Sequence, residues 1–214
     1  MKKTILCYGD SNTWGWIPEN GERYSEKERW PAILAERFRD SYNVIEMGQN
    51  GRTTVWDDPV EIDRNGWKQL VPIMECCSPL DLLIIMLGTN DCRERFGVNG
   101  FNIALSISKV AIKAKQTLLG PDHSSPKILV VNPPYIQAHY RQETVNGPAF
   151  GENADLRSKD IGKYLPSIIH DCGCEYWDSN EFVETSRTDG IHLSIEGHKR
   201  FADGISKKIL EMLL

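Results

Sequence analysis

The chain alternates short apolar runs with longer stretches of helical pattern, and this alternation constrains its fold more than any other feature. The apolar runs are rich in β-branched residues and predict five strands, at residues 4–8, 43–47, 81–87, 127–131 and 175–177. Helix-like periodicity is found at residues 30–39, 60–74, 103–119, 155–170 and 194–213, the last preceded by Ser194 as N-cap. Strands that alternate with helices run parallel, so the pattern predicts an α/β fold with one open five-stranded parallel sheet.

Length and charge limit the choice of partners. The 214 residues suffice for one sizeable core, and no repeat or linker divides them, so we expect a single domain over residues 1–214. Lys and Arg number 25 against 30 for Asp and Glu, a net charge of −5 without a basic block. The longest aliphatic run, residues 82–87, is far shorter than the about 20 residues of a membrane-spanning helix. We therefore expect a soluble protein with no nucleic-acid or membrane partner.

The amino-terminal residues and the cysteines favour a reducing compartment. The apolar stretch after Lys3 meets Gly9 and Asp10 too soon to form an export signal, which predicts a cytoplasmic protein. Six cysteines in a chain with its own core are expected to be free thiols. Cys172 and Cys174 form a C-x-C pair with no second pair at zinc-finger distance. We therefore predict no metal and no cofactor.

Polar motifs directly follow two predicted strands. Gly-Asp-Ser at residues 9–11 directly follows the first predicted strand. This position predicts that the Ser11 hydroxyl lies at the carboxyl edge of the sheet, which is a suitable place for a nucleophile. Gly-Thr-Asn-Asp at residues 88–91 ends the third strand, and the side-chain amide of Asn90 can donate to an oxyanion. Each motif alone is also compatible with a simple turn or helix cap.

The carboxyl-terminal motif Asp-Gly-Ile-His supplies a base. Its spacing lets Asp189 accept a hydrogen bond from one ring nitrogen of His192 while the other nitrogen faces outward. Gly51, after the second strand, offers a backbone N–H as a further oxyanion donor. A lone histidine near a helix start is usually structural, but these motifs bring Ser11, Asn90 and His192 to one sheet edge. Together they predict a site for nucleophilic acyl transfer.

These four blocks, in this order over residues 9–192, resemble the SGNH (GDSL-type) hydrolases. Residues 9–16, 51–54 with 57–59, and 84–91 look most like the bacterial arylesterase and acyltransferase branch. The resemblance implies a flavodoxin-like three-layer α/β/α sandwich and a homo-oligomer. It also implies the site roles: Ser11 as nucleophile, Asp189 and His192 as its partners, and the N–H groups of Ser11 and Gly51 with the Asn90 side chain as oxyanion hole.

The same resemblance implies a serine esterase that hydrolyses small aryl or short-chain acyl esters through an acyl-enzyme, with acyl transfer when an alcohol or peroxide replaces water. Substrate-binding residues are expected beside the nucleophile and the base: Asp10, Asn12, Trp16 and Ile191. Asn12 departs from the leucine that many members carry. Residues 19–29 and 132–152 lack clear periodicity and are candidate rims of the site, or plain surface loops.

Two other functions remain open at this point. The same triad could act on an acetylated carbohydrate or a lysophospholipid, since specificity in such enzymes lies in the loops. A flavodoxin-like protein could instead bind a phosphate or nucleotide at its strand-end loops without catalysis. That function needs a phosphate-cradling loop such as G-x-x-x-x-G-K-S/T, and the sequence contains none.

Overall fold

A computed structural model describes residues 2–142 and 146–213, and in it five strands form one parallel sheet. The strands are β1 (Lys3–Gly9), β2 (Tyr42–Gly48), β3 (Leu82–Met86), β4 (Lys127–Asn132) and β5 (Glu175–Asp178). Their order is β2-β1-β3-β4-β5, and all neighbours pair in parallel. The predicted sheet is therefore confirmed, with strand bounds that differ from the predicted ones by at most one residue.

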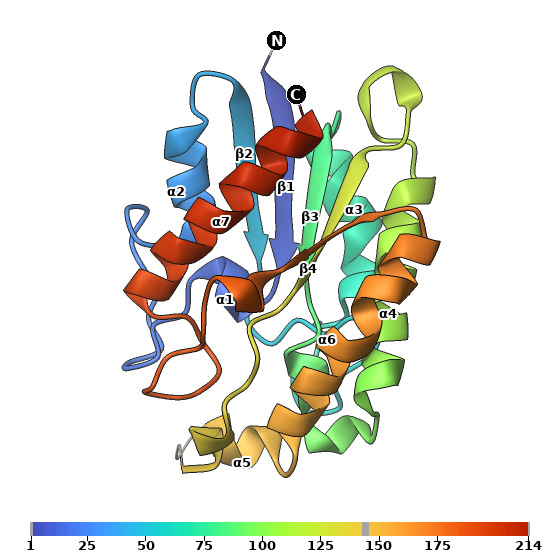
Figure 1. Ribbon diagram of the computed structural model, residues 1–214. Helices are drawn as coiled ribbons and strands as arrows, with labels where there is room; N and C mark the ends of the chain where they lie inside the picture. Colours follow the sequence, from blue (N-terminus) through green and yellow to red (C-terminus); the bar gives the residue numbers. More distant parts are fainter. Residues whose placement is uncertain (1, 143–145, 214) are drawn as a thin grey trace.

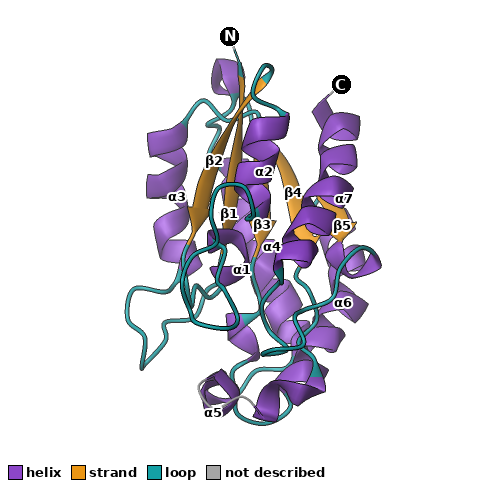
Figure 2. Ribbon diagram, turned by 90° about the vertical axis from the view of Figure 1, so that its left-hand side faces the viewer, coloured by secondary structure: helices purple, strands orange, loops and turns teal. Residues whose placement is uncertain are grey.

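Helices cover both faces of the sheet (Figure 1). One face packs against α2 (Trp30–Arg37) and α7 (Ile195–Leu213), the other against α3 (Gly66–Cys77), α4 (Gly100–Gln116) and α6 (Ala154–Asp171). Side chains of β1 alternate between these layers: Ile5 and Cys7 belong to the first core, Leu6 and Tyr8 to the second. Figure 2 shows α7 and α3 on opposite sides of the strands. The fold is thus the three-layer sandwich that the resemblance implied.

The predicted helix over residues 60–74 is wrong at its start. The helix α3 begins at Gly66, where the Asn65 side chain caps it by accepting a hydrogen bond from Lys68 N at 3.3 Å. The preceding residues form a loop instead, because the Asp58 carboxylate accepts from the backbone N–H groups of Val60 and Glu61 at 2.9 and 3.1 Å. Here side-chain hydrogen bonding outcompetes the helical pattern that the apolar residues suggested.

Other helix ends differ less from the sequence pattern. Ser194 is confirmed as an N-cap, since its hydroxyl accepts from Gly197 N at 3.1 Å. The helix α4 starts three residues earlier than predicted, where the Asn99 side chain caps it. The short helices α1 (Ser11–Trp14) and α5 (Asn146–Phe150) were not predicted, because four or five residues carry no periodicity. Further 3₁₀ turns span Asn90–Cys92, Glu94–Phe96, Pro121–His123, Ala138–Gln142 and Ser179–Glu181.

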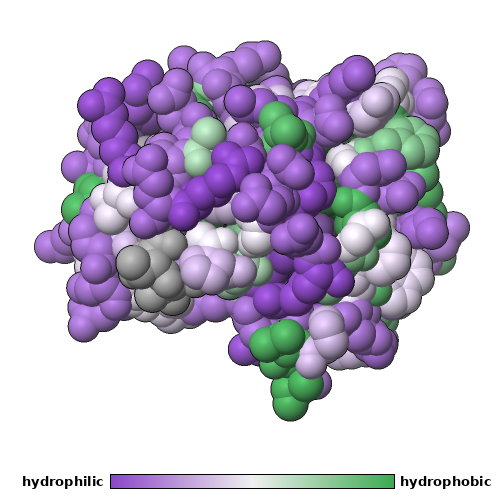
Figure 3. Space-filling model, turned by 90° about the horizontal axis from the view of Figure 1, so that it is seen from below, coloured by the Kyte–Doolittle hydropathy of each residue, from purple (hydrophilic) through white to green (hydrophobic). Residues whose placement is uncertain are grey.

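All five strands point their carboxyl ends toward one edge, the lower one in Figure 1. The connection after β1 passes through α2 on one face, and the connection after β3 passes through α4 on the other. Because β1 and β3 are neighbours, this divergence opens a crevice between their ends, where α/β proteins bind ligands. Seen from below, the face that carries these strand ends is mostly hydrophilic, with hydrophobic groups in a few places (Figure 3).

Within residues 2–142 and 146–213, every helix is too short or too polar to span a lipid bilayer. The described part of the chain holds no group of three or more His, Cys, Asp or Glu side chains placed to bind a metal ion. All six cysteines are free thiols.

Candidate active site

Ser11 begins the helix α1 immediately after β1. Asp10 caps this helix, its carboxylate accepting from Asn12 N at 2.9 Å. The helix lies against the end of β2, and only glycine fits there, since a Cβ on Gly48 would lie 2.2 Å from Trp14 N. As the first helical residue, Ser11 has an N–H with no partner inside the helix. The strand end thus presents both the hydroxyl and the N–H of Ser11 at the crevice.

His192 lies between Ser11 and Asp189. Its Nε2 is 2.9 Å from Ser11 Oγ, and its Nδ1 is 2.5 Å from Asp189 Oδ2. The other Asp189 oxygen accepts from the backbone N–H groups of Ile191 and His192 at 2.9 and 3.0 Å. Because an ionised carboxylate only accepts, Nδ1 carries the ring proton, which leaves Nε2 free to accept from the Ser11 hydroxyl. Burial raises the pKa of Asp189, but the hydrogen bonds from His192 and Ile191 outweigh it and hold the pKa below its usual value.

Asn12 joins the loop of His192 to the helix of Ser11. Its side-chain amide donates to Ile191 O at 3.2 Å, and its carbonyl oxygen accepts from Leu193 N at 2.9 Å. Both bonds are buried and flank His192 on either side in the sequence. The Trp16 ring stacks on the imidazole with its centroid 5.5 Å away. The His192 imidazole is therefore held through the backbone of its neighbours as well as by Asp189.

Gly51 and Asn90 bring two further donors to the crevice. Gly51 adopts a φ of +75°, and among the described residues its N–H has no acceptor. Asn90 uses one amide hydrogen to donate to Arg52 O at 3.1 Å, which leaves the second hydrogen free. The next residue, Asp91, accepts from Thr54 N at 3.0 Å and also from Thr54 Oγ1. These bonds fasten the turn after β3 to the loop after β2, so the two donors keep a fixed relation.

A cavity of about 140 Å³ joins these groups. Its lining residues are Ser11, Trp16, Asn50, Gly51, Glu61, Asn90, Arg93, Asn146, Phe150 and His192. Asp189 lies behind His192, whereas Asp10, Asn12 and Ile191 are buried beside the cavity without lining it. A larger hollow of about 1180 Å³ lies beside α2 and contains none of the predicted site residues, so volume alone does not identify the site.

The two candidate rim segments differ. Asn146 and Phe150 of the segment 132–152 line the cavity, while residues 143–145 of that segment lie outside the described residues. The segment 19–29 contributes none of the lining residues.

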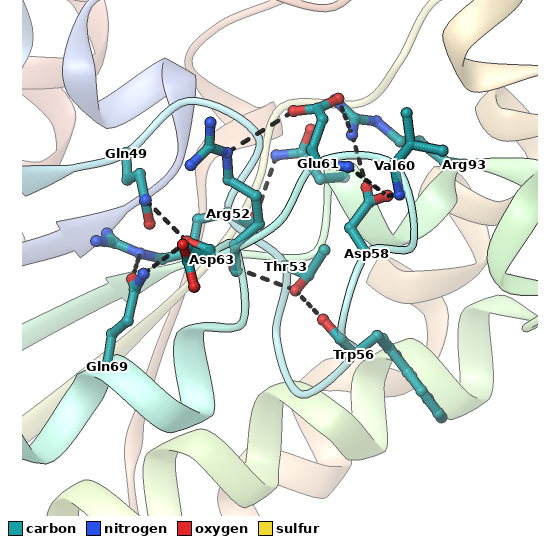
Figure 4. A network of polar contacts seen from close by, with 12 residues as sticks. Gln49, Arg52, Thr53, Trp56, Asp58, Val60, Glu61, Asp63, Gln69 and Arg93 are labelled. Atoms are coloured by element: carbon teal, nitrogen blue, oxygen red, sulfur yellow. Dashed lines mark hydrogen bonds and ion pairs between the residues drawn. The ribbon is translucent and has the colours of Figure 1, made fainter.

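Sequence reasoning missed the charged wall of the cavity, formed by Glu61 and Arg93. Arg93 Nη1 donates to Glu61 Oε1 at 2.6 Å and to Asp58 Oδ2 at 3.1 Å (Figure 4). Arg95 Nη2 donates to the same two carboxylates. These partners are more than 30 positions apart in the chain, so no spacing in the sequence signals them.

Two buried carboxyl groups beneath the site carry raised pKa values. Burial is the main cause for both Asp10 and Asp91, and it raises each pKa to about 6. Hydrogen bonds from Asn12 N to Asp10 and from Thr54 to Asp91 oppose the shift without cancelling it. Ionising these groups at neutral pH therefore costs folding free energy.

A parallel α/β/α sandwich that brings serine, histidine and aspartate into hydrogen-bond contact at one strand edge has the architecture of a serine hydrolase. The chain belongs to the GDSL-like Lipase/Acylhydrolase family, whose model matches residues 7–200. This confirms the family resemblance seen in the sequence motifs.

Solved structures with the same fold are similar over nearly the whole chain. A carbohydrate acetylesterase from Sinorhizobium meliloti superimposes with a TM-score of 0.90 at 33% identity, over 99% of this chain and 100% of the other. An aryl esterase from M. smegmatis superimposes with a TM-score of 0.88 at 30% identity, again over 99% and 100%. No curated protein sequence matches the chain.

Proposed function

We propose that this protein is a serine esterase that hydrolyses small aryl or short-chain acyl esters through an acyl-enzyme. The observation that carries the proposal is the continuous hydrogen-bonded chain from Ser11 Oγ through His192 to Asp189, with distances of 2.9 and 2.5 Å. It opens into a cavity that also contains Gly51 and Asn90.

The proposed reaction begins when His192 Nε2 takes the proton of Ser11 Oγ as this oxygen attacks the ester carbonyl. The oxyanion that forms accepts from the N–H groups of Ser11 and Gly51 and from the Asn90 amide. Collapse breaks the bond to the alcohol oxygen, which leaves with the proton from His192. Asp189 keeps the ring in the required tautomer and stabilises the imidazolium.

Water resolves the acyl-enzyme by the same steps in reverse, with His192 as its base. An alcohol or a peroxide can take the place of water, which gives acyl transfer. The Trp16 ring stacked on His192 supports this second outcome, since it covers the base with an apolar surface. We further propose that the protein self-associates, as the resemblance implies, and light scattering tests this.

Cavity size supports a short acyl group. The space of about 140 Å³ beside Ser11 is smaller than the roughly 300–1,000 Å³ of pockets for drug-sized ligands. The similarity to an aryl esterase and to a carbohydrate acetylesterase also supports an ester of a small acyl or aryl group as the substrate. Acetylated carbohydrate is a second candidate substrate, favoured by the charged wall of Glu61 and Arg93.

A p-nitrophenyl ester series from acetyl to octanoyl, combined with labelling by a fluorophosphonate, tests the proposal. We expect kcat/KM to be highest for the shortest acyl groups and the label to be attached to Ser11. Absence of turnover with every ester, together with an unlabelled Ser11, would contradict the proposal. It would favour instead a non-catalytic protein that binds a phosphate or nucleotide.

A further inference from the structure

Arg93 presents an unused hydrogen-bond donor to the cavity that contains Ser11. The side chain is only 8% exposed, and its Nη1 makes both of its ion pairs, with Asp58 and Glu61. Its Nη2 donates to no described residue and, unlike Nε, is not among the fully buried atoms that lack a partner. Arg93 is a lining residue, so this donor is available to a molecule that enters the cavity.

The ion-pair network behind the charged wall contains more positive than negative side chains. Glu61 Oε1 accepts from Arg93 and Arg95, and its Oε2 lies 3.8 Å from Arg64 Nε. Three guanidinium groups thus surround the carboxylates of Glu61 and Asp58, an excess of one positive charge. Of these three arginines, Arg93 is the one that lines the cavity, so its Nη2 donor favours an acceptor oxygen on the substrate.

Arg93 cannot easily turn away from the cavity. Its partner Asp58 has a fully buried side chain that also accepts from two backbone N–H groups of its own loop. The guanidinium carbon lies 5.3 Å from the ring centroid of Phe150, another lining residue. Figure 4 shows the carboxylates of Asp58 and Glu61 directed at Arg93. The donor is therefore fixed before any substrate binds, which favours specific binding.

We propose that Arg93 determines substrate choice by donating from Nη2 to an oxygen that the ester carries near its reacting carbonyl. The substrates are then esters of oxygen-rich alcohols, such as acylated polyols, in preference to alkyl esters of the same size. This inference rests on the esterase function proposed above.

Two acetates of equal size test the contact. In 2-methoxyethyl acetate an ether oxygen replaces one methylene of butyl acetate, so the two differ by a single acceptor. The measured quantity is the ratio of their kcat/KM values, followed by acetate release. We expect Arg93→Met to lower this ratio about 10-fold relative to the unaltered protein, in line with the loss of a hydrogen bond from a charged donor. Intrinsic differences in ester reactivity cancel in that comparison.

Matched variants separate the contact from the ion-pair network. Arg95→Met removes an arginine that pairs with the same carboxylates without lining the cavity, and we expect it to keep the original ratio. Arg93→Lys keeps a charge beside Asp58 but removes the forked donor, so it too lowers the ratio. Circular dichroism shows whether Arg93→Met folds. If it does not fold, the ratio measured for Arg93→Lys tests the contact in its place.

An unchanged ratio in both Arg93 variants overturns the inference, and so does an equal fall in Arg95→Met. Failure of the esterase proposal has a different signature, since then neither acetate is hydrolysed and the fluorophosphonate leaves Ser11 unlabelled.

Discussion

The two sides of the cavity are built in different ways. The reaction side contains Ser11, Asn90 and His192, and the binding side contains Glu61 and Arg93. On the reaction side, Asp189 and His192 are three residues apart and are held by short hydrogen bonds, many of them to backbone N–H groups. On the binding side, ion pairs join Asp58 to Arg93 across 35 positions of the chain. Within the reaction side, the pair of His192 and Asp189 therefore comes from a compact local motif, whereas the binding side comes from the packing of distant loops. Changes on the reaction side should affect the hydrolysis of all esters alike, whereas changes on the binding side should alter the preference for one ester over another.

Replacement of Ser11 by alanine is the strongest test of the reaction side. We expect kcat to fall by about 10⁶-fold for every ester, because the variant lacks the attacking oxygen. The thermal midpoint should stay within a few degrees, since little packing is lost. Steady-state kinetics and thermal unfolding provide the two measurements, and near-normal turnover in a folded variant would remove Ser11 from the mechanism.

Asn90→Ala tests the oxyanion donor at the end of β3. We expect kcat to fall by about 10²- to 10³-fold, with the same factor for 2-methoxyethyl acetate and butyl acetate, because both esters form the same oxyanion. Single-turnover kinetics with each acetate measures the effect. A loss confined to one of the two esters would place Asn90 on the binding side instead.

Asp10→Asn tests the cost of the buried carboxylate beneath the reaction side. A raised pKa means that the folded state holds its proton more tightly, so the protein loses stability as pH rises from about 4 through about 6. The Asp10→Asn variant lacks this loss of stability. We expect its free energy of unfolding to equal that of the unaltered protein at pH 4 and to exceed it by about 2–3 kcal/mol at pH 8.

Urea unfolding across this pH range measures the difference in the free energy of unfolding. The charge of Asp10 also helps to raise the pKa of Asp91, so the substitution relieves Asp91 as well and adds to the difference in the same direction. Two stability profiles that run parallel from pH 4 to 8 would mean that Asp10 does not titrate as its burial suggests.

Asn12→Leu separates positioning from binding. The variant loses both hydrogen bonds that flank His192, so we expect kcat to fall about 10-fold while KM and the ratio of the two acetates stay unchanged. Full saturation curves with each acetate measure all three quantities. A raised KM or an altered ratio would show instead that Asn12 contacts substrate, as the sequence motif alone predicts.

Much of the framework could be predicted from the sequence because its signals are local. Short runs of mainly apolar residues marked the strands, and polar residues directly after β1 and β3 had to meet at one edge of a parallel sheet. The i, i+3 spacing of Asp189 and His192 likewise follows from a single turn.

Tertiary contacts determined what the sequence did not reveal. Val60 and the residues after it carry a helix-like pattern, yet their loop is held by Asp58 and by arginines from the turns after β3. Glu61 and Arg93 became lining residues only through those same contacts. Asn12 was predicted from its position beside Ser11, but its bonds to both neighbours of His192 join residues 179 and 181 positions apart, which no local pattern reveals.

The separation of Ser11 and His192 by 181 positions has a consequence for biosynthesis. A ribosome that adds 5–20 residues each second needs roughly 10–35 s to pass from one to the other. During that interval the proposed nucleophile lacks its proposed base, so on the proposed mechanism the nascent chain does not cleave esters. We therefore expect the activity to begin only after His192 has been translated, and a product that stops before His192 to be inactive.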